Sequence, residues 1–305
     1  MAVGIGVEVG SAGLRAAVLE RRGSSLNLLA WQELPCDTGS PEVLAQGLST
    51  LRRTLRVKQG VVLGLPTASV LLTTVEPLIV DARRASLAVQ FELQQYLPFD
   101  LSQASWHYQW VNGLPSSKGK ARRLTGPGSP EGIRGAGRTA VVVAIKRSRL
   151  EERVAACRRA GMAIRAVSVN PLAALNALRQ PRDSASALWL HLDGPQAEWI
   201  VWSQNRLQVV PIAVDLAALS LDDVVQELGH SLEALRGSTG IAAGPATPVR
   251  FFGVHPALRE MEERLKTVLQ ISVTRDDLER VLRMPKVRVE PVERACVAVG
   301  LALQG

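Results

Sequence analysis

The sequence has few of the residues that build metal sites and disulfide frameworks. Among its 305 residues there are three cysteines and four histidines. Cys36, Cys157 and Cys296 lie far apart and form no Cys-x-x-Cys pair, a pattern that indicates no disulfide framework and is typical of a reducing compartment. The histidines share no spacing that zinc sites use, such as His-Glu-x-x-His. We therefore expect no metal site built on these side chains.

The chain also has no long hydrophobic run. Its longest late apolar stretch, residues 295–303, is too short to span a bilayer. The apolar N-terminal stretch carries Glu8 and follows a strand pattern from its start, unlike a signal peptide. We expect neither a signal peptide nor a membrane span, and the cytoplasm is the expected location.

Positive charge is in excess and clustered. The chain has 36 Lys and Arg against 28 Asp and Glu, a formal net charge of +8. The excess gathers in residues 52–58, 118–138 and 146–159. Arginines on helix faces are usually solvated, but such clusters also suit anionic lipid headgroups or an acidic partner. Aromatic residues make up only 4% of the chain and none interleaves with these clusters, so we expect no nucleic-acid partner.

The most informative feature that is present is one pattern that occurs twice. Each copy reads as three consecutive strands, with a glycine turn after the first, then a helix and a further strand. The strands of the first copy are residues 3–10, 14–20, 26–34 and 61–66, and those of the second are 187–194, 199–202, 206–214 and 249–256. Two facing copies would place two glycine turns across one cleft, a geometry that can hold a phosphate chain.

Length and composition fit two domains, because 305 residues exceed what one core usually serves and 47% apolar content can fill two cores. We expect a first domain over residues 1–180, a second over 181–291, and a C-terminal helix, 292–305, that docks on the first domain. An inserted small subdomain is expected at 80–146 within the first domain. Its segment 112–138 is rich in Gly, Pro, Ser and Arg, a composition that predicts a flexible basic loop.

Local signals predict where the main helices begin. Ser40 and Ser220 each stand directly before an apolar stripe of helical period, so each serine is expected to cap a helix. Ser148 and Glu151 have the spacing of a capping box for a third helix. Residues 70–75 follow a buried strand and a proline turn, and we expect them to fold back and pair with that strand.

Three stretches carry a resemblance to a known family. Gly6-Val-Glu-Val-Gly-Ser-Ala-Gly-Leu-Arg15 resembles the first phosphate loop of actin-like ATPases, which reads Gly-x-Asp-x-Gly-Ser/Thr and is followed by Lys or Arg. Residues 91–100, Phe-Glu-Leu-Gln-Gln-Tyr-Leu-Pro-Phe-Asp, with the strand 108–111 after them, and residues 141–170 are similar to segments of the type IV pilus assembly protein PilM family, which is related to FtsA. The resemblance covers most of the chain. It implies an α/β fold of the actin-like, ribonuclease H-like duplicated type, with two domains and a small subdomain inserted in the first.

The resemblance also implies a nucleotide site between the two glycine turns. The residues that would bind ATP and Mg²⁺ are Glu8, Gly10, Ser11, Ala12, Arg15, Asp193, Gly194 and Gly253. This sequence departs from the family in both loops: Glu8 stands where the family has Asp, His191 at the second acidic position, and Asp193 at a glycine. The second domain is also shortened, because the long helical subdomain that frames the nucleoside in the family is missing after Val210.

These departures remove contacts that a nucleotide needs. Losing a metal-ordering carboxylate and a nucleoside wall costs several kcal/mol, at about 1–3 kcal/mol for each buried polar contact. Our hypothesis is a pseudo-ATPase that binds ATP and Mg²⁺ weakly or not at all and has no catalytic residue. The alternative is a working actin-like ATPase or sugar-kinase-like phosphotransferase that uses Glu8, Gly10, Ser11 and Asp193 around Mg-ATP.

A partner site is implied as well. In the PilM family, the groove between the first domain and its inserted subdomain accepts the short cytoplasmic N-terminal tail of the inner-membrane protein PilN. The resemblance implies the same role here for the helix at 82–96 and the residues after it. The candidate partner-binding side chains are Leu87, Phe91, Leu93, Tyr96, Leu97 and Phe99. The alternative is that all of them pack inside the subdomain.

The implied function is that of a cytoplasmic scaffold in a type IV pilus or a related secretion machine. It would bind the cytoplasmic N-terminal tail of an inner-membrane PilN-like partner, and it would lie peripheral to the inner membrane through that partner. Other inner-membrane proteins of the pilus complex would be further contacts. The basic clusters would meet the anionic membrane surface.

Overall fold

The structure of the chain is a computed structural model, and it describes most of the 305 residues. The described residues are 2–23, 25–77, 84–111, 139–178, 186–203, 206–212, 215–216, 218–239, 248–254, 258–269, 273–274, 278, 282–284, 287, 289 and 292–305. The basic loop that the sequence predicts at 112–138 lies outside the described residues.

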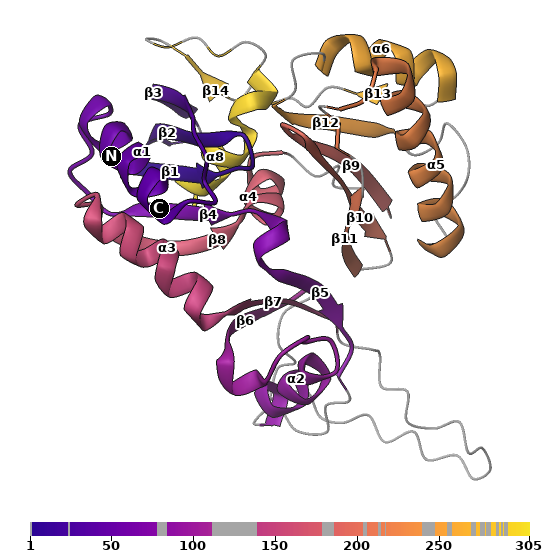
Figure 1. Cartoon of the computed structure of the whole chain (residues 1–305), viewed down its shortest axis with the longest axis horizontal. Coiled ribbons are helices and arrows are strands. Elements are labelled where there is room, and N and C mark those ends of the chain that lie inside the picture. The colour runs from indigo at the N-terminus through magenta and orange to yellow at the C-terminus, as the bar shows by residue number, and fades with distance from the viewer. Residues whose placement is uncertain are drawn as a thin grey trace.

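Two sheets of the same design form the body of the molecule (Figure 1). The first contains β1 (Ala2–Val9), β2 (Gly13–Arg22), β3 (Ser25–Pro35), β4 (Val61–Leu65), β8 (Ile164–Val169) and β14 (Leu282–Arg283), in the order β14-β3-β2-β1-β4-β8. The second contains β9 (Ser186–Asp193), β10 (Gln196–Ser203), β11 (Arg206–Ile212), β12 (Val249–Val254) and β13 (Val273–Thr274), in the order β11-β10-β9-β12-β13. In each sheet three antiparallel strands are followed by two parallel ones, so β1, β2, β3, β4 and β8 correspond to β9, β10, β11, β12 and β13. The expected duplicated α/β fold is confirmed.

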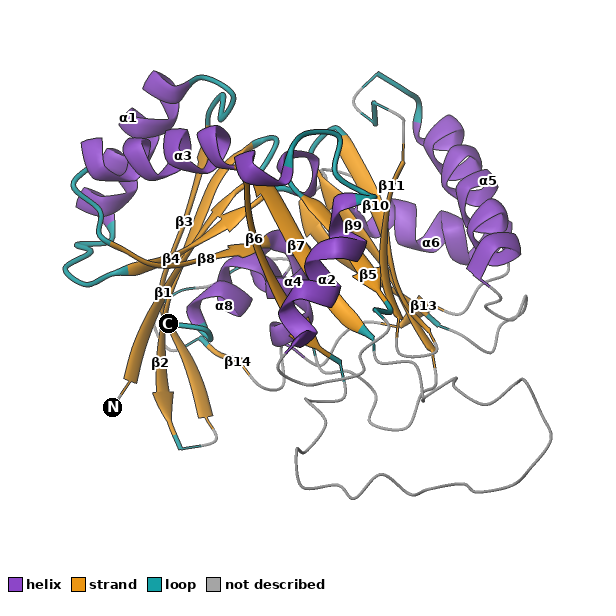
Figure 2. Cartoon of the chain, turned by 90° about the horizontal axis from the view of Figure 1, so that it is seen from below, coloured by secondary structure: helices purple, strands orange, loops and turns teal. Residues whose placement is uncertain are grey.

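Helices cover the outer faces of both sheets, and two more helices lie between the sheets (Figures 1 and 2). The outer helices are α1 (Pro41–Thr54) and α3 (Arg147–Arg159) on the first sheet, and α5 (Leu221–Thr239) and α6 (Leu258–Leu269) on the second. The inner helices are α4 (Asn170–Ala177) and α8 (Cys296–Ala302). They share one core with Trp189 of β9 and Phe252 of β12, so this core joins the two domains.

Every residue of the C-terminal helix α8 is buried, and the helix is accordingly apolar on all of its faces. Glycines allow this close packing: a Cβ at Gly6 would lie 2.1 Å from the carbonyl oxygen of Ala298, and one at Gly300 would lie 1.7 Å from that of Ala173. The two ends of the chain therefore meet on the first domain (Figure 1). Within the described ranges, no helix combines the length and the hydropathy needed to cross a membrane.

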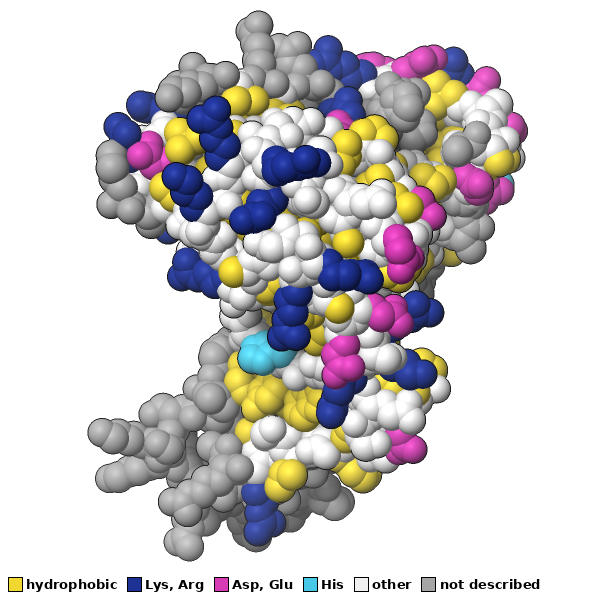
Figure 3. All heavy atoms as spheres, turned by 60° about the vertical axis from the view of Figure 1, so that its left-hand side comes forward, with side chains coloured by type: hydrophobic (Ala, Val, Ile, Leu, Met, Phe, Trp, Pro, Cys, Tyr) yellow, Lys and Arg dark blue, Asp and Glu magenta, His cyan; other side chains and the backbone are white. Residues whose placement is uncertain are grey.

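A small subdomain extends from the first domain. Its sheet consists of β5 (Leu71–Val75), β7 (Ala140–Lys146) and β6 (Ala104–Trp110), in that order, and α2 (Ala85–Gln94) packs on one face. In Figure 3 the subdomain lies below the narrow part of the molecule. The predicted pairing of residues 70–75 with β4 is wrong, because a short helical turn at Thr67–Ser69 carries the chain away from the first sheet and β5 pairs with β7 instead.

The two predicted serine caps are confirmed, and the predicted capping box is wrong. The Ser40 hydroxyl accepts a hydrogen bond from the Val43 N–H, and the Ser220 hydroxyl accepts one from the Asp223 N–H. By contrast, α3 begins at Arg147 and has no side-chain cap. Strand β7 runs directly into this helix, so Ser148 already lies within its first turn and is not a cap.

Candidate functional site: the interdomain cleft and the subdomain groove

The turn after β1 and the turn after β9 face each other, and glycines make the contact possible. Gly194 has a φ of +61°, and a Cβ there would lie 2.8 Å from the Cβ of Ala12. A Cβ at Gly10 would lie 2.0 Å from Nη2 of Arg15 and 2.7 Å from Oδ1 of Asp193. The space between the two turns is therefore filled by the protein itself.

A buried ion cluster joins the two turns. Glu8 on β1 and Arg15 on β2 lie directly opposite each other in the antiparallel ladder. The Nη2 atom of Arg15 lies 2.6 Å from Oε1 of Glu8 and 2.5 Å from Oδ1 of Asp193, at the end of β9. All three residues are at least 95% buried. The guanidinium of Arg15 thus bridges one carboxylate of the first domain and one of the second.

Two hydrogen bonds from Ser11 to Asp193 reinforce this bridge. The Ser11 N–H donates to Oδ2 of Asp193 at 2.6 Å, and the Ser11 hydroxyl donates to the Asp193 carbonyl. Both Asp193 carboxylate oxygens therefore have partners from the first domain. A carboxylate bonded in this way positions the second turn against the first.

The cluster has shifted pKa values because it is buried. Burial raises the pKa of Glu8 from 4.5 to about 7; Arg15 opposes the shift and Asp193 adds to it. Burial would also raise the pKa of Asp193, but Arg15, then His191 and the Ser11 N–H, lower it below the ordinary value. The pKa of Arg15 is raised by its two carboxylates despite burial, so it stays charged.

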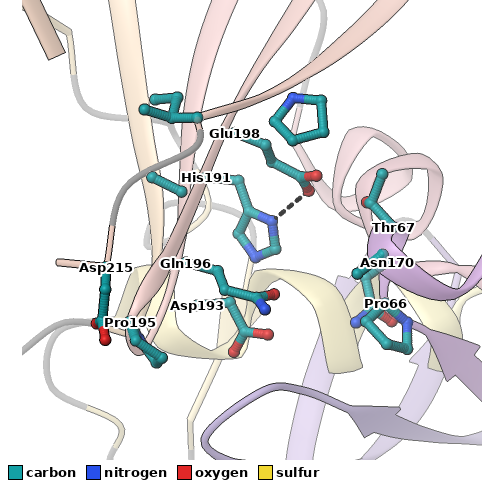
Figure 4. Close-up of a pocket in the computed structure, with 13 residues that line it drawn as sticks. Pro66, Thr67, Asn170, His191, Asp193, Pro195, Gln196, Glu198 and Asp215 are labelled. Carbon is teal, nitrogen blue, oxygen red and sulfur yellow. Dashed lines mark hydrogen bonds and ion pairs between the residues drawn. The ribbon is translucent and has the colours of Figure 1, made fainter. Parts of the chain in front are cut away.

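A cavity of about 420 Å³ lies beside the cluster (Figure 4). His191 points into it: its Nδ1 lies 2.7 Å from Oε1 of Glu198, and its ring stacks on Phe252 with 4.6 Å between centroids. Burial would lower the pKa of His191, but the bond to Glu198 raises it, as do Asp193 and Glu8. Asn170, at the start of α4, donates from Nδ2 to the Val9 carbonyl at 2.9 Å.

The cavity contains polar groups that the sequence reasoning missed. Glu198, Asn170 and Thr67 line it, and three buried atoms have no hydrogen-bond partner: His191 Nε2, Asn170 Oδ1 and Thr67 Oγ1. Asn170 follows the end of parallel strand β8, where ligands of open α/β sheets gather, and this position was a usable signal. Among the described residues, no group of three His, Cys, Asp or Glu side chains could hold a metal ion.

A second site, the subdomain groove, is an apolar groove of about 670 Å³ between the subdomain and the first domain. The face of β6 and β7 that does not touch α2 forms one wall, where Gln109 pairs with Val141 and His107 pairs with Val143. Strand β8 and helix α4 form the other wall, with Val167 of β8 38% exposed. Among the described strands, β6 and β8 are the last of their sheets, so each wall ends in a strand edge that no described strand covers.

The side chains predicted to bind the partner lie elsewhere. Leu87 and Phe91 are 64% and 68% exposed on the outer face of α2, on the opposite side of the small sheet from the groove, and Tyr96, which follows the helix, is 50% exposed. Leu93 is fully buried in the subdomain core, and Leu97 and Phe99 are half-buried. None of the six lines the subdomain groove. Alternate residues of β7 face opposite sides, so α2 and the groove cannot share one surface.

The structure is similar to several solved structures. No protein-family model matches the sequence, and no curated protein matches it. Among solved structures, the chain matches a PilM-PilN type IV pilus biogenesis complex with a TM-score of 0.73 and 19% identity, over 99% of this chain and 98% of that one. It matches the cytoplasmic domain of EpsL, an inner membrane component of the type II secretion system of Vibrio cholerae, with a TM-score of 0.54 and 15% identity, over 100% and 96%. A Bacteroides thetaiotaomicron protein of unknown function with an actin-like ATPase fold matches with a TM-score of 0.52 and 10% identity, over 97% and 95%.

The chain has the actin-like ATPase fold. Of the residues that the sequence assigned to nucleotide binding, all but one meet at the two facing turns: Glu8, Gly10, Ser11, Ala12, Arg15, Asp193 and Gly194. Gly253 lies within β12 instead, with a φ of +114°. A Cβ there would lie 1.9 Å from the Leu192 carbonyl oxygen, so this glycine serves the close approach of two strands.

These residues do not fit a phosphate chain. Arg15 and the Ser11 N–H, the groups that could bind phosphate oxygens, are already bound to Asp193. A triphosphate would have to separate the two turns and would bring its charge next to the carboxylates of Asp193 and Glu8. Buried charges that lose a partner are strongly destabilised, so this exchange is unfavourable.

Proposed function

We propose that this protein is a PilM-like, non-catalytic scaffold of a type IV pilus or related secretion assembly complex. In this proposal the subdomain groove holds an extended cytoplasmic tail of an inner-membrane, PilN-like partner. The likeness to PilM in its complex with PilN, and to the cytoplasmic domain of the inner-membrane component EpsL, supports the proposal through the fold. The observation that carries it is the groove itself.

The groove suits an extended apolar peptide. Apolar side chains from both walls, such as Val143 and Leu172, would each cover partner side chains, and burying one Leu is worth about 1.5–3 kcal/mol. The edge strands β6 and β8 would offer backbone hydrogen bonds to the same segment. Exposed polar side chains on β6, His107 and Gln109, would meet backbone or polar groups of the tail.

The partner site can be tested with a peptide. The probe is a synthetic peptide with the short N-terminal cytoplasmic sequence of a PilN-like, single-span inner-membrane protein, and its binding is followed by fluorescence anisotropy. The exposed groove residue Val167→Asp is compared with Phe91→Asp on the outer face of α2, where the sequence placed the site. We expect the first variant to weaken binding at least about tenfold, the cost of one buried apolar contact and more, and the second to leave it unchanged. The reverse result would transfer the partner site to α2, and no binding by the wild type would refute the proposal.

We also propose that the interdomain cleft does not bind Mg-ATP with the micromolar affinity expected of an ATPase. The support is the closed arrangement of Ser11, Arg15 and Asp193. Calorimetry with Mg-ATP on the purified protein should then give no heat of binding in the micromolar range. A magnesium-dependent micromolar signal would instead establish the ATPase or phosphotransferase alternative.

A further inference from the structure

The outer helices of the two domains carry opposite charge. Helices α1 and α3 of the first domain contain seven Lys and Arg against three Asp and Glu. The corresponding helices of the second domain, α5 and α6, contain four Lys and Arg against seven Asp and Glu. Among the described residues, positive charge is thus in excess on one face, which we call the α1–α3 face: helices α1 and α3 with the adjoining residues 55–60 and 160–165.

Much of this charge is exposed and unneutralised. Arg53, Lys58, Arg158 and Arg165 are exposed, and none pairs with a carboxylate among the described residues. In the second domain, by contrast, Arg264 and Lys266 of α6 are bound to acidic side chains. Figure 3 shows Lys and Arg side chains spread over the left and middle of the larger upper part of the molecule, whereas Asp and Glu side chains gather toward its right-hand edge.

Contacts between its elements make the face continuous. A Cβ at Gly161 would lie 2.9 Å from Nη1 of Arg52, so the end of α3 adjoins the end of α1. A Cβ at Gly60 would lie 3.3 Å from the Cβ of Arg165, so β8 adjoins the same place. The cations of these three elements therefore act on one area rather than on separate ones.

The α1–α3 face borders the subdomain groove. Arg147, at the start of α3, donates to the carbonyls of Ser102 and Ala104 at 3.3 Å and 3.4 Å, beside β6. Leu150 of α3 lines the groove. If the groove holds the tail of a membrane protein, as proposed above, the bilayer from which the tail emerges is within reach of this face.

We infer that the α1–α3 face binds the anionic surface of a membrane through its unpaired cations. Groups of four to eight Lys and Arg are typical of anionic lipid recognition. Nucleic acid is the other polyanion to consider, but residues 36–60 and 146–165 contain no Phe, Trp or Tyr on which bases could stack. The lipid surface, which needs only charge, matches this composition.

The test uses the purified full chain and vesicles without any partner protein. Cosedimentation with vesicles of phosphatidylglycerol and phosphatidylcholine is compared with vesicles of phosphatidylcholine alone. We expect binding to the anionic vesicles only, and its loss when the salt is raised from about 0.1 M to about 1 M, because the screening length falls from about 10 Å to about 3 Å. Binding to both vesicle types, or to neither, would overturn the inference.

A matched pair of variants locates the contact. Arg53→Gln with Arg158→Gln removes two unpaired cations from the α1–α3 face, and Arg206→Gln with Arg259→Gln removes two exposed cations from the second domain, of which Arg206 is paired with Glu76. Each cation near an anionic surface raises binding about fivefold, so the first pair should lose at least about tenfold and the second little. Equal losses would show that only net charge matters and would overturn the assignment of the face.

Two controls separate lipid binding from groove binding and from nucleic-acid binding. The vesicles carry no tail peptide, so vesicle binding and groove binding can fail independently. Duplex DNA at the same salt serves as the competing polyanion. If DNA binds more tightly than anionic vesicles and the Arg53→Gln, Arg158→Gln variant loses it, the face is a nucleic-acid surface and the lipid assignment is wrong.

Discussion

The two domains share one strand order but use their side chains differently. In the first domain, the β1–β2 pair carries Glu8 and the cation Arg15, while in the second the corresponding pair carries His191 and Glu198, with Asp193 at the turn. The sequence resemblance implied a ligand between the two turns, whereas in the structure the turns meet through Arg15. The outer helices diverge further, basic in one domain and acidic in the other.

This difference shows that the two domains share one backbone arrangement while their side chains have different roles. The corresponding strands still form the same ladders. The turn positions keep glycines because the backbones approach closely, whether or not a ligand is bound. The two turns here are joined by an internal ion cluster of Glu8, Arg15 and Asp193.

The largest effect should come from removing the cation that joins the domains. Arg15→Met leaves the carboxylates of Glu8 and Asp193 buried without their partner, and we expect a loss of about 3–5 kcal/mol in the free energy of unfolding. Urea denaturation measures it. The control is Arg206→Met, because Arg206 on β11 also joins the two parts of the molecule, to Glu76, but in solvent. It should cost less than about 1 kcal/mol, and similar losses in both variants would show that burial is not the deciding factor.

The same cluster should make stability depend on pH through Glu8. Its pKa is about 7 in the folded protein against an ordinary 4.5, so the folded state binds this proton more tightly than the unfolded chain does. The stabilisation is complete below about pH 4.5 and is lost as the pH rises through about 7, a total of about 3 kcal/mol. Glu8→Gln cannot lose a proton, so its stability relative to the wild type should increase from about pH 5 to about pH 8. Urea unfolding over this range checks the sign, and a difference that stays constant with pH would contradict the shift.

The contact between the turns can be separated from the strain of a left-handed glycine. Gly194 and Gly23 have nearly equal φ values, +61° and +59°, but only Gly194 faces the other domain, where a Cβ would lie 2.8 Å from that of Ala12. Each change to Ala costs about 1–2 kcal/mol for the backbone conformation. Gly194→Ala should cost about 1–3 kcal/mol more for overpacking. Equal unfolding free energies for the two variants would mean that the turns do not press together.

The sequence predicted the repeated part of the fold better than the sites. The duplicated strands and the glycine turns depend on local alternation and on backbone geometry, both of which are visible in one sequence. The pairing of β5 was wrong because Val-rich β4 and β7 offer equally good partners, and only the turn at Thr67–Ser69 decides between them. The surface of α2 was predicted as the groove because exposed apolar residues such as Phe91 do not show which side of the small sheet they cover.

The interdomain cleft shows the same limit of prediction from sequence. The two turns could be placed opposite each other from the repeat, but their closure depends on a contact across 178 positions of sequence, between Arg15 and Asp193. The Asp at a glycine position indicated that a phosphate site had changed. It did not indicate that the Asp193 carboxylate binds Arg15 and the Ser11 N–H, because that requires the distance between the domains.

The smallest effect tests whether the repeat extends to the caps of the outer helices. Ser40 starts α1 and Ser220 starts α5, the corresponding helix of the second domain, and their hydroxyls accept N–H groups at 3.4 Å and 3.3 Å. Ser40→Ala and Ser220→Ala should each cost about 1 kcal/mol. Ser220 also donates to the Asp223 carboxylate at 2.6 Å, a shorter bond than the 3.4 Å contact of Ser40 with Glu42, so its loss should be the larger of the two. Urea midpoints of the two variants decide the order; a larger loss at Ser40 would show that the first domain depends more on its outer helix, and that the two caps are not equivalent parts of one repeated design.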